Sequence, residues 1–231
     1  MTITYSRRHA LWLSAGLLVA CRDRRSAADA SAPAPHVLPP NRPAMAATPT
    51  PTPTPTDGAT PSCIETHANI EGPYYRAGAP ERSSLVDPGM AGTPLTIEGR
   101  VSGLDCGRGL AGVELDVWHA THDGHYDNDG TMHLGRERFL LRGRIRTDAE
   151  GRYRVSTIVP GRYLNGPQYR PAHVHVKVRA GGFQPLTTQL YFPGDPYNDV
   201  DPFIHRSLVM NLEKSRELMV LGHFDFVLRN A

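Results

Sequence analysis

Two histidines in the C-terminal half of the chain have the spacing of a metal-binding pair. His173 and His175 are two residues apart in the segment 170–178, RPAHVHVKV. Successive side chains of a β-strand point to opposite faces, so both imidazoles would lie on one face and Val174 and Val176 on the other. Such a pair can bind a metal ion through two nitrogens, although taken alone it fits two surface histidines equally well.

Two tyrosines upstream add a second kind of ligand. Tyr126 ends the glycine-containing turn 124–126 after an apolar segment that ends at Trp118, and Tyr163 ends the turn 160–163 after one that ends at Ile158. A phenol has a pKa of about 10 and becomes a ligand only when a strongly Lewis-acidic cation displaces its proton. Paired phenolates therefore favour Fe(III) over Zn(II) or Cu(II). Either tyrosine alone would more often be a packing residue.

Short segments in which apolar and polar residues alternate must position these side chains. Turns that contain Gly or Pro separate them, as at 148–151 and 193–196. The predicted strands span 95–101, 113–118, 139–146, 153–158, 173–178, 187–192 and 224–228. Only 211–220 has a plausible helical face. Many short strands at this spacing predict an all-β fold, a β-sandwich of mostly antiparallel strands with long loops and little helix.

The first 21 residues have the pattern of an export signal. Arg7 and Arg8 precede the apolar stretch 10–20, which is too short to span a bilayer as a mature helix. The arginine pair resembles a twin-arginine signal. Residues 18–21, LVAC, resemble a bacterial lipobox, in which Cys21 is lipidated after cleavage. The lipobox predicts a membrane-anchored lipoprotein that faces the periplasm or the cell exterior. The alternative is an uncleaved signal anchor or a simple secretory peptide.

Residues 22–61 are rich in Pro, Thr and Ala, with the run TPTPTPTP at 48–55, and have almost no large apolar side chain to bury. We expect a linker of extended, semi-rigid geometry. The folded domain is expected to span 62–231. In an oxidising compartment its two cysteines, Cys63 and Cys106, are expected to form a disulfide that closes a loop of about 44 residues. Two buried free thiols are the alternative.

Composition and charge exclude one class of partner. The chain of 231 residues is 39% hydrophobic and 21% charged, which is ordinary for a soluble domain. Its net charge is only +2, and the Lys and Arg residues are scattered. This pattern has no basic patch for nucleic acid.

Six motifs resemble, in order, those of the intradiol ring-cleavage dioxygenases, the family of catechol 1,2-, hydroxyquinol and protocatechuate 3,4-dioxygenases. They lie at 71–75 (EGPYY), 112–126 (from GVELDVW to Tyr126), 144–148 (RIRTD), 159–163 (VPGRY), 170–175 (RPAHVH) and 188–192 (TQLYF). The resemblance identifies 62–231 as an intradiol dioxygenase-like catalytic domain.

The resemblance implies one non-haem Fe(III) ion per chain. Its ligands would be Tyr126, Tyr163, His173 and His175. In the family the second tyrosine, here Tyr163, is displaced by the substrate and takes up one of its protons. Arg170 and Gln189 would stand beside the metal, and the fixed cation of Arg170 could stabilise negative charge that develops on the ring. The implied reaction opens a catechol-type ring with O2 to a cis,cis-muconate-type dicarboxylate.

Two other interpretations stay open at this point. The chain could be a non-catalytic exported β-sandwich that binds another molecule. It could also be a 2-His-1-carboxylate Fe(II) oxygenase that uses His173, His175 and an acid such as Asp195. The sequence leaves open which catechol derivative is the substrate and how many copies of the chain assemble.

Overall fold

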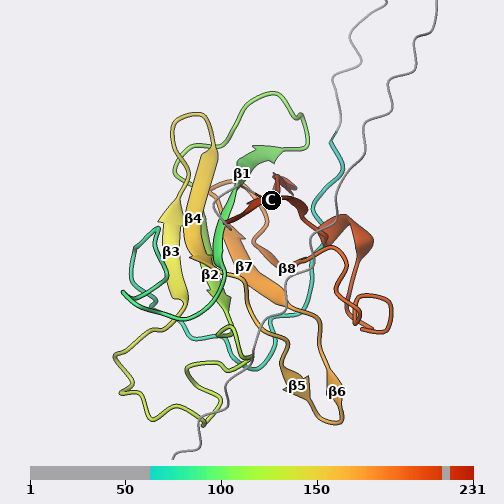
Figure 1. Cartoon of the computed structure of the whole chain (residues 1–231). Coiled ribbons are helices and arrows are strands. Elements are labelled where there is room, and N and C mark those ends of the chain that lie inside the picture. Colours follow the sequence, from blue (N-terminus) through green and yellow to red (C-terminus); the bar gives the residue numbers. More distant parts are fainter. Residues whose placement is uncertain (1–62, 215–218) are drawn as a thin grey trace, which may run out of the picture. The chain divides into compact units, whose positions relative to one another are not determined.

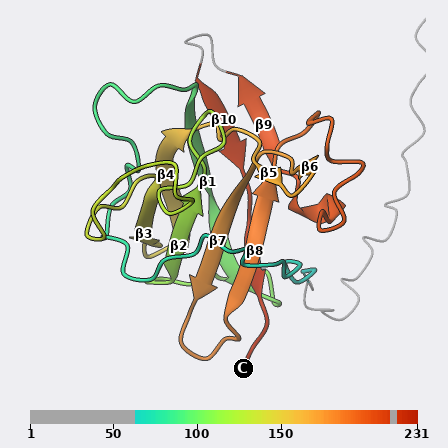
Figure 2. The ribbon, with the colours of Figure 1, turned by 90° about the horizontal axis from the view of Figure 1, so that it is seen from below.

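Two β-sheets lie face to face in the computed structural model, which describes residues 63–214 and 219–231 (Figures 1 and 2). The expected export signal 1–21, the lipidation site Cys21 and the linker 22–61 lie outside the described residues. Among those that are described, no helix has the length and apolar character needed to cross a membrane.

The first sheet is built around the long strand β1 (Pro94–Gly103). On one side β1 pairs antiparallel with β4 (Arg152–Ile158). On the other side it pairs in parallel with β10 (Val220–His223) and then with β11 (Phe226–Leu228), and β10 pairs antiparallel with β9 (Asn211–Lys214).

The second sheet is antiparallel throughout, in the order β3-β2-β7-β8. Its strands are β2 (Glu114–His119), β3 (Arg142–Arg146), β7 (His173–Arg179) and β8 (Leu186–Tyr191). A small hairpin of β5 (Leu164–Asn165) and β6 (Gln168–Tyr169) projects from the end of the sandwich where the β2–β3 loop also lies (Figure 1). One 3-10 turn, η1 (Arg206–Leu208), precedes β9.

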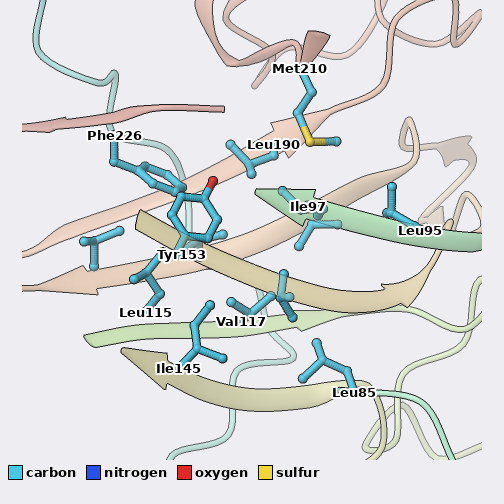
Figure 3. Packing of buried hydrophobic residues seen from close by; sticks show 14 of the residues in the cluster. Leu85, Leu95, Ile97, Leu115, Val117, Ile145, Tyr153, Leu190, Met210 and Phe226 are labelled. Carbon is cyan, nitrogen blue, oxygen red and sulfur yellow. The ribbon is translucent and has the colours of Figure 1, made fainter. Parts of the chain in front are cut away.

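Apolar side chains from the facing sides of the sheets fill the space between them (Figure 3). Strand alternation produces this core, because every second residue of β2 and β7 points inward. The inward residues of these two strands include Leu115, Val117, Val174 and Val176, all buried. The residues between them point to the outer face of the second sheet, which leaves that face free to carry polar side chains.

The expected all-β sandwich is confirmed, but the helix expected at 211–220 is wrong. Residues 211–214 and 220–223 are the antiparallel strands β9 and β10. The buried Met210 and the half-buried Leu212 alternate with the polar Asn211 and Glu213, which is the period of a strand. Pairing of β10 with β1 outweighs the helix propensity of Glu213 and Lys214. The β5–β6 hairpin was not expected, and β3 begins at Arg142 rather than at 139.

The structure joins Cys63 to Cys106 by a disulfide, with Cα atoms 5.4 Å apart. The backbone nitrogen of Cys63 also donates a hydrogen bond to the carbonyl of Leu104 at 3.0 Å. These contacts fix the start of the described segment to the turn that follows β1. From there the chain runs along the edge strand β8, where Thr188 Oγ1 donates to the His67 carbonyl at 2.8 Å and the backbone nitrogen of Asn69 donates to the Thr187 carbonyl at 2.8 Å.

Candidate metal centre

The outer face of the second sheet places the two histidines beside polar partners. In the register of β7, His175 lies between Trp118 of β2 and Gln189 of β8, and His173 lies opposite Tyr191. The expected geometry of the HVH segment is therefore present, with both imidazoles on one face. Both histidines are buried, and the segment 69–75 and the loops that carry the tyrosines contact the residues of this face.

Four aromatic side chains enclose one point above this face. The rings of Tyr126, Tyr163, His173 and His175 follow one another in a closed circuit, with neighbouring centroids 4.7 to 6.3 Å apart. The Nε2 atoms of the two histidines are 3.1 Å apart. The four residues expected as ligands are thus brought together although 49 positions separate the first from the last.

The polar atoms of this cluster fit a bound cation. Burial lowers the pKa of His173 to about 3 and holds that of His175 well below its ordinary value, so both rings are neutral and carry lone pairs. Burial also raises the pKa of Tyr126, and its hydroxyl has no hydrogen-bond partner among the described residues. A buried, unpartnered hydroxyl is costly unless something binds it. Two phenols with two imidazoles are the donor set that suits Fe(III).

A carboxylate site is not supported. Within 63–214 and 219–231 no three His, Cys, Asp or Glu side chains are grouped as a metal site. Asp195 instead accepts hydrogen bonds from Arg162 Nε at 2.9 Å and from the backbone nitrogen of Ala172 at 3.1 Å. The alternative of a 2-His-1-carboxylate centre with Asp195 is therefore wrong for this structure.

Two glycines allow the loops that carry the tyrosines to touch. Gly124 has φ +91°, and a Cβ there would lie 2.2 Å from the carbonyl oxygen of Arg162 and 3.5 Å from the Cα of Tyr163. A Cβ at Gly161 would lie 2.5 Å from the backbone nitrogen of Gly124. Only hydrogen fits at either position, so this backbone contact sets the spacing between the two loops.

A backbone carbonyl and neighbouring residues fix the orientation of the two histidine rings. His173 Nδ1 donates to the carbonyl of Pro171 at 2.6 Å, which leaves Nε2 as the atom with the lone pair. The indole of Trp118 stacks on His175 with centroids 4.6 Å apart and planes within 6°. Gly72, with φ +73°, also lies close to that ring, since a Cβ on Gly72 would be 3.3 Å from Cε1. The His175 ring thus stacks on an indole and has a turn close to its Cε1 edge.

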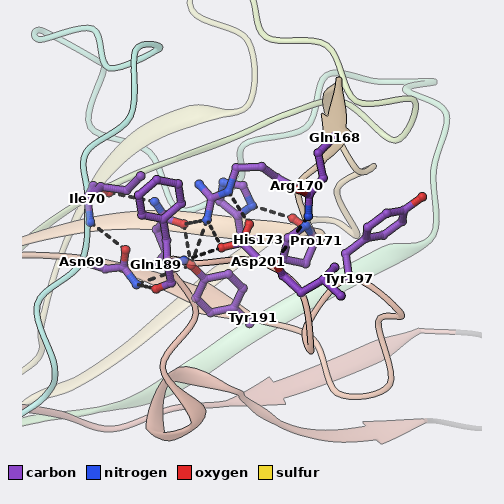
Figure 4. A network of polar contacts seen from close by, with 12 residues as sticks. Asn69, Ile70, Gln168, Arg170, Pro171, His173, Gln189, Tyr191, Tyr197 and Asp201 are labelled. Atoms are coloured by element: carbon purple, nitrogen blue, oxygen red, sulfur yellow. Dashed lines mark hydrogen bonds and ion pairs between the residues drawn. The ribbon is translucent and has the colours of Figure 1, made fainter. Parts of the chain in front are cut away.

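Arg170 lies beside the cluster in a network of buried polar side chains (Figure 4). Its Nη2 donates to Gln189 Oε1 at 3.0 Å and to the Tyr191 hydroxyl at 3.1 Å. Gln189 Nε2 in turn donates to the carbonyl of Ile70 at 2.8 Å. The structure brings Arg170 and Gln189, both expected beside the metal, into direct contact, and Asp201 pairs with Arg170 through Nε at 2.6 Å.

Tyr74 covers the cluster from the N-terminal segment. Its ring stacks on Tyr126 with centroids 4.4 Å apart and meets the edge of Tyr163 at 5.7 Å. Burial and the neighbouring Tyr163 raise the pKa of Tyr74. A hollow of about 580 Å³ is lined in part by Tyr169 and Arg162, and none of the four clustered rings contributes to its lining.

Comparison with known proteins identifies the family. A family model described as Dioxygenase matches residues 70–230. The chlorocatechol 1,2-dioxygenase of Rhodococcus opacus is 32% identical over 190 residues, which cover 71% of this chain and 73% of that protein. The chain belongs to the intradiol dioxygenase family. Catechol 1,2-dioxygenase 2 of Acinetobacter lwoffii is 42% identical over 149 residues, 57% of this chain and 53% of that protein, so the chain spans about half the length of that relative.

A solved structure gives the same result for the fold. The dioxygenase domain of a dioxygenase carbohydrate-binding protein fusion from the cellulolytic bacterium Streptomyces sp. SirexAA-E superposes with a TM-score of 0.64 and 43% identity. The match covers 73% of this chain and all of that domain. The intradiol dioxygenase fold of 63–231 therefore corresponds to a whole domain of a related protein.

Some residues of the site carried no signal in the sequence. Asp201 lies 31 positions after Arg170 in a loop, and no periodicity links the two. Tyr191 belongs to the TQLYF motif but had no expected role. His119 ends β2 and has both ring nitrogens satisfied, by the Ala120 carbonyl at 2.7 Å and by Thr157 Oγ1 at 2.6 Å, so it is a core histidine.

Proposed function

We propose that this intradiol dioxygenase holds one Fe(III) ion per chain and uses O2 to open a catechol-type ring. The observation that carries the proposal is the convergence of two phenols and two imidazoles on one buried point, where the Tyr126 hydroxyl has no protein partner among the described residues. A non-catalytic binding module would have no use for this cluster. The names of the relatives, catechol and chlorocatechol 1,2-dioxygenases, support a catechol as the substrate class.

The residues that would hold the ion are Tyr126, Tyr163, His173 and His175. A ferric ion in this position would withdraw electron density from a bound catecholate, so that a ring carbon becomes reactive toward O2. Tyr163 would be the proton acceptor, because a phenolate oxygen can take a proton from a catechol hydroxyl. Tyr163 directly precedes the β5–β6 hairpin, whose residues 164–169 are exposed, so it can move more readily than Tyr126.

Arg170 would stabilise charge on the substrate. Its Nη1 is buried and has no hydrogen-bond partner among the described residues. Its other donors are occupied by Asp201, Gln189 and Tyr191. A fixed N–H donor in a site that excludes water stabilises a transition state most when it points at the atom on which charge develops. Both atoms of O2 enter the product, a cis,cis-muconate-type dicarboxylate, so the reaction requires no external reductant.

We also propose that the protein is exported and anchored through a lipid on Cys21. The support is the arginine pair, the apolar stretch and the LVAC sequence at 18–21. The test is metabolic labelling with a palmitate analogue in a bacterial host. Label and membrane association that both disappear in Cys21→Ala support the anchor, and unlabelled protein released as a soluble form contradicts it.

The catalytic proposal is tested with iron-loaded protein, catechol and an oxygen electrode. We expect one O2 consumed per catechol, with a product identified by mass as the muconate. His175→Ala should abolish turnover, whereas the exposed His133→Ala should leave it unchanged. Iron-loaded wild-type protein that consumes no O2 with catechol, chlorocatechol or hydroxyquinol would contradict the proposal.

A further inference from the structure

Asp201 makes a two-point contact with the buried arginine of the site. Its Oδ2 accepts from Arg170 Nε at 2.6 Å and its Oδ1 from Nη2 at 3.2 Å. The two side chains are 2% and 4% exposed. Asp201 is itself fixed, since its Oδ1 accepts from the backbone nitrogen of Phe203 at 2.8 Å and its own backbone nitrogen donates to the carbonyl of Tyr197 at 3.0 Å.

The other contacts of the guanidinium leave one edge free. Nη2 also reaches Gln189 and Tyr191, and the Phe203 ring lies under the guanidinium at 4.9 Å from Cζ. Nη1 alone has no partner among the described residues although it is buried. The planar group is therefore held on one edge and on one face. These contacts fix the direction in which Nη1 points, because a rotation of the guanidinium that moved Nη1 would break the pair with Asp201.

The negative charge of Asp201 also suits its place beside Arg170. Arg170 is a buried cation beside four side chains that would hold a tripositive ion, and two cations at close range repel. The carboxylate of Asp201, whose Oδ2 lies 2.6 Å from Arg170 Nε, offsets this repulsion. A buried ion pair contributes little net stability when compared with an apolar replacement, so stability alone is a weak reason for this pair.

We infer that Asp201 is a positioning residue that orients Arg170 so that Nη1 is the donor presented to the substrate. This inference rests on the proposed ring cleavage. It assigns a role to the 193–203 loop, which no motif of the sequence had connected to the reaction. Asp201 does not touch the four clustered rings through any contact in the structure, so its effect should pass through Arg170.

The first test compares Asp201→Asn with Asp195→Asn. Asp195 is the matched control because it lies in the same loop, its carboxylate is also buried, and it pairs with a different arginine, Arg162, at 2.9 Å. Asp201→Asn should keep the iron content and lower kcat per iron by roughly tenfold to a hundredfold, the scale of a displaced catalytic group. kcat and kcat/KM should fall together, because the contact of Arg170 strengthens in the transition state. Asp195→Asn should change kcat by less than about threefold on the same scale.

The second test asks whether the effect passes through Arg170. In an Arg170→Ala background, Asp201→Asn should cause no further loss of turnover per iron. Independently of activity, nitrogen-15 NMR of metal-free protein should show a slowly exchanging, downfield Nε–H signal that disappears in Arg170→Lys. This signal should also disappear in Asp201→Asn and persist in Asp195→Asn.

Three results would overturn the inference. They are an Asp201→Asn enzyme with wild-type turnover per iron, an equal loss in Asp195→Asn, and an Nε–H signal that survives Asp201→Asn. Each of these leaves the proposed ring cleavage intact if wild-type protein is active. Wild-type protein that opens no catechol ring overturns the proposed function and the role of Asp201 together.

Discussion

Replacing Gly124 with alanine tests whether the contact between the two tyrosine loops builds the metal centre. A Cβ at this position would meet the carbonyl oxygen of Arg162 at 2.2 Å, whereas ordinary van der Waals contact begins at 3.4 Å. The loops would have to separate by about 1 Å to relieve such an overlap. Because Gly124 precedes Tyr126 by two residues and Arg162 precedes Tyr163 by one, the shift would move both phenols.

The expected magnitude has two parts. Gly124 has φ +91°, which costs an alanine about 1 kcal/mol. Overpacking against backbone adds about 1–3 kcal/mol, so the free energy of unfolding should fall by about 2–4 kcal/mol. Gly130→Ala is the matched control, because Gly130 lies in the same loop at φ +89° and a Cβ there would have no atom within 4 Å. It should lose only about 1 kcal/mol from the backbone conformation.

The assay is urea unfolding of metal-free protein with the disulfide intact, followed by titration with iron. Gly124→Ala should unfold at lower urea than Gly130→Ala, with an unchanged slope, and should bind iron at least tenfold more weakly than that control, as expected when ligands are displaced. Equal stability and equal iron affinity in the two variants would refute the argument that this contact sets the spacing of the tyrosines.

Three further predictions concern other parts of the molecule. Arg170→Ala should keep its iron and colour but lose roughly a hundredfold in turnover per iron, with poor rescue by lysine, and wild-type turnover would show that Arg170 is only structural. Replacing Cys63 and Cys106 by alanine should lower the free energy of unfolding by about 2–4 kcal/mol in urea, and mass mapping that finds both thiols free in exported wild-type protein would contradict the bridge. Burial lowers the pKa of His173 to about 3 and of His119 to about 4, so the unfolded chain takes up protons first as the pH falls below about 6.5. Metal-free protein should therefore lose about 2 kcal/mol of stability for each of these buried histidines between pH 7 and pH 5, and urea midpoints that stay constant over this range would contradict their burial as neutral rings.

Much of the site could be predicted because it depends on strand period. Alternation alone places His173 and His175 on one face of β7, and it directs Val174 and Val176 into the core. The antiparallel register then brings Gln189 beside His175. Contacts of this kind repeat every two residues, so they can be predicted from the alternation of residue types in the sequence.

Other contacts cannot be predicted from such a pattern. The pair of Arg170 and Asp201 joins a strand end to a loop, and only the folded path of 193–203 brings them together. The segment 211–220 contains good helix formers, yet Leu212 lies in strand β9, because β9 pairs with β10 and β10 pairs in parallel with β1. Long-range pairing of this kind overrides the intrinsic helix propensity of the segment.

The most direct test of a ferric site with tyrosine ligands is the visible spectrum of the purified, iron-loaded protein, measured together with its iron content. We expect one iron per chain and a red to burgundy colour from phenolate-to-iron charge transfer, which should weaken and shift when Tyr126 is replaced by phenylalanine. The same replacement at the exposed Tyr169 should leave the spectrum unchanged. A colourless protein that contains a full complement of iron would contradict the assignment of these tyrosines as ligands.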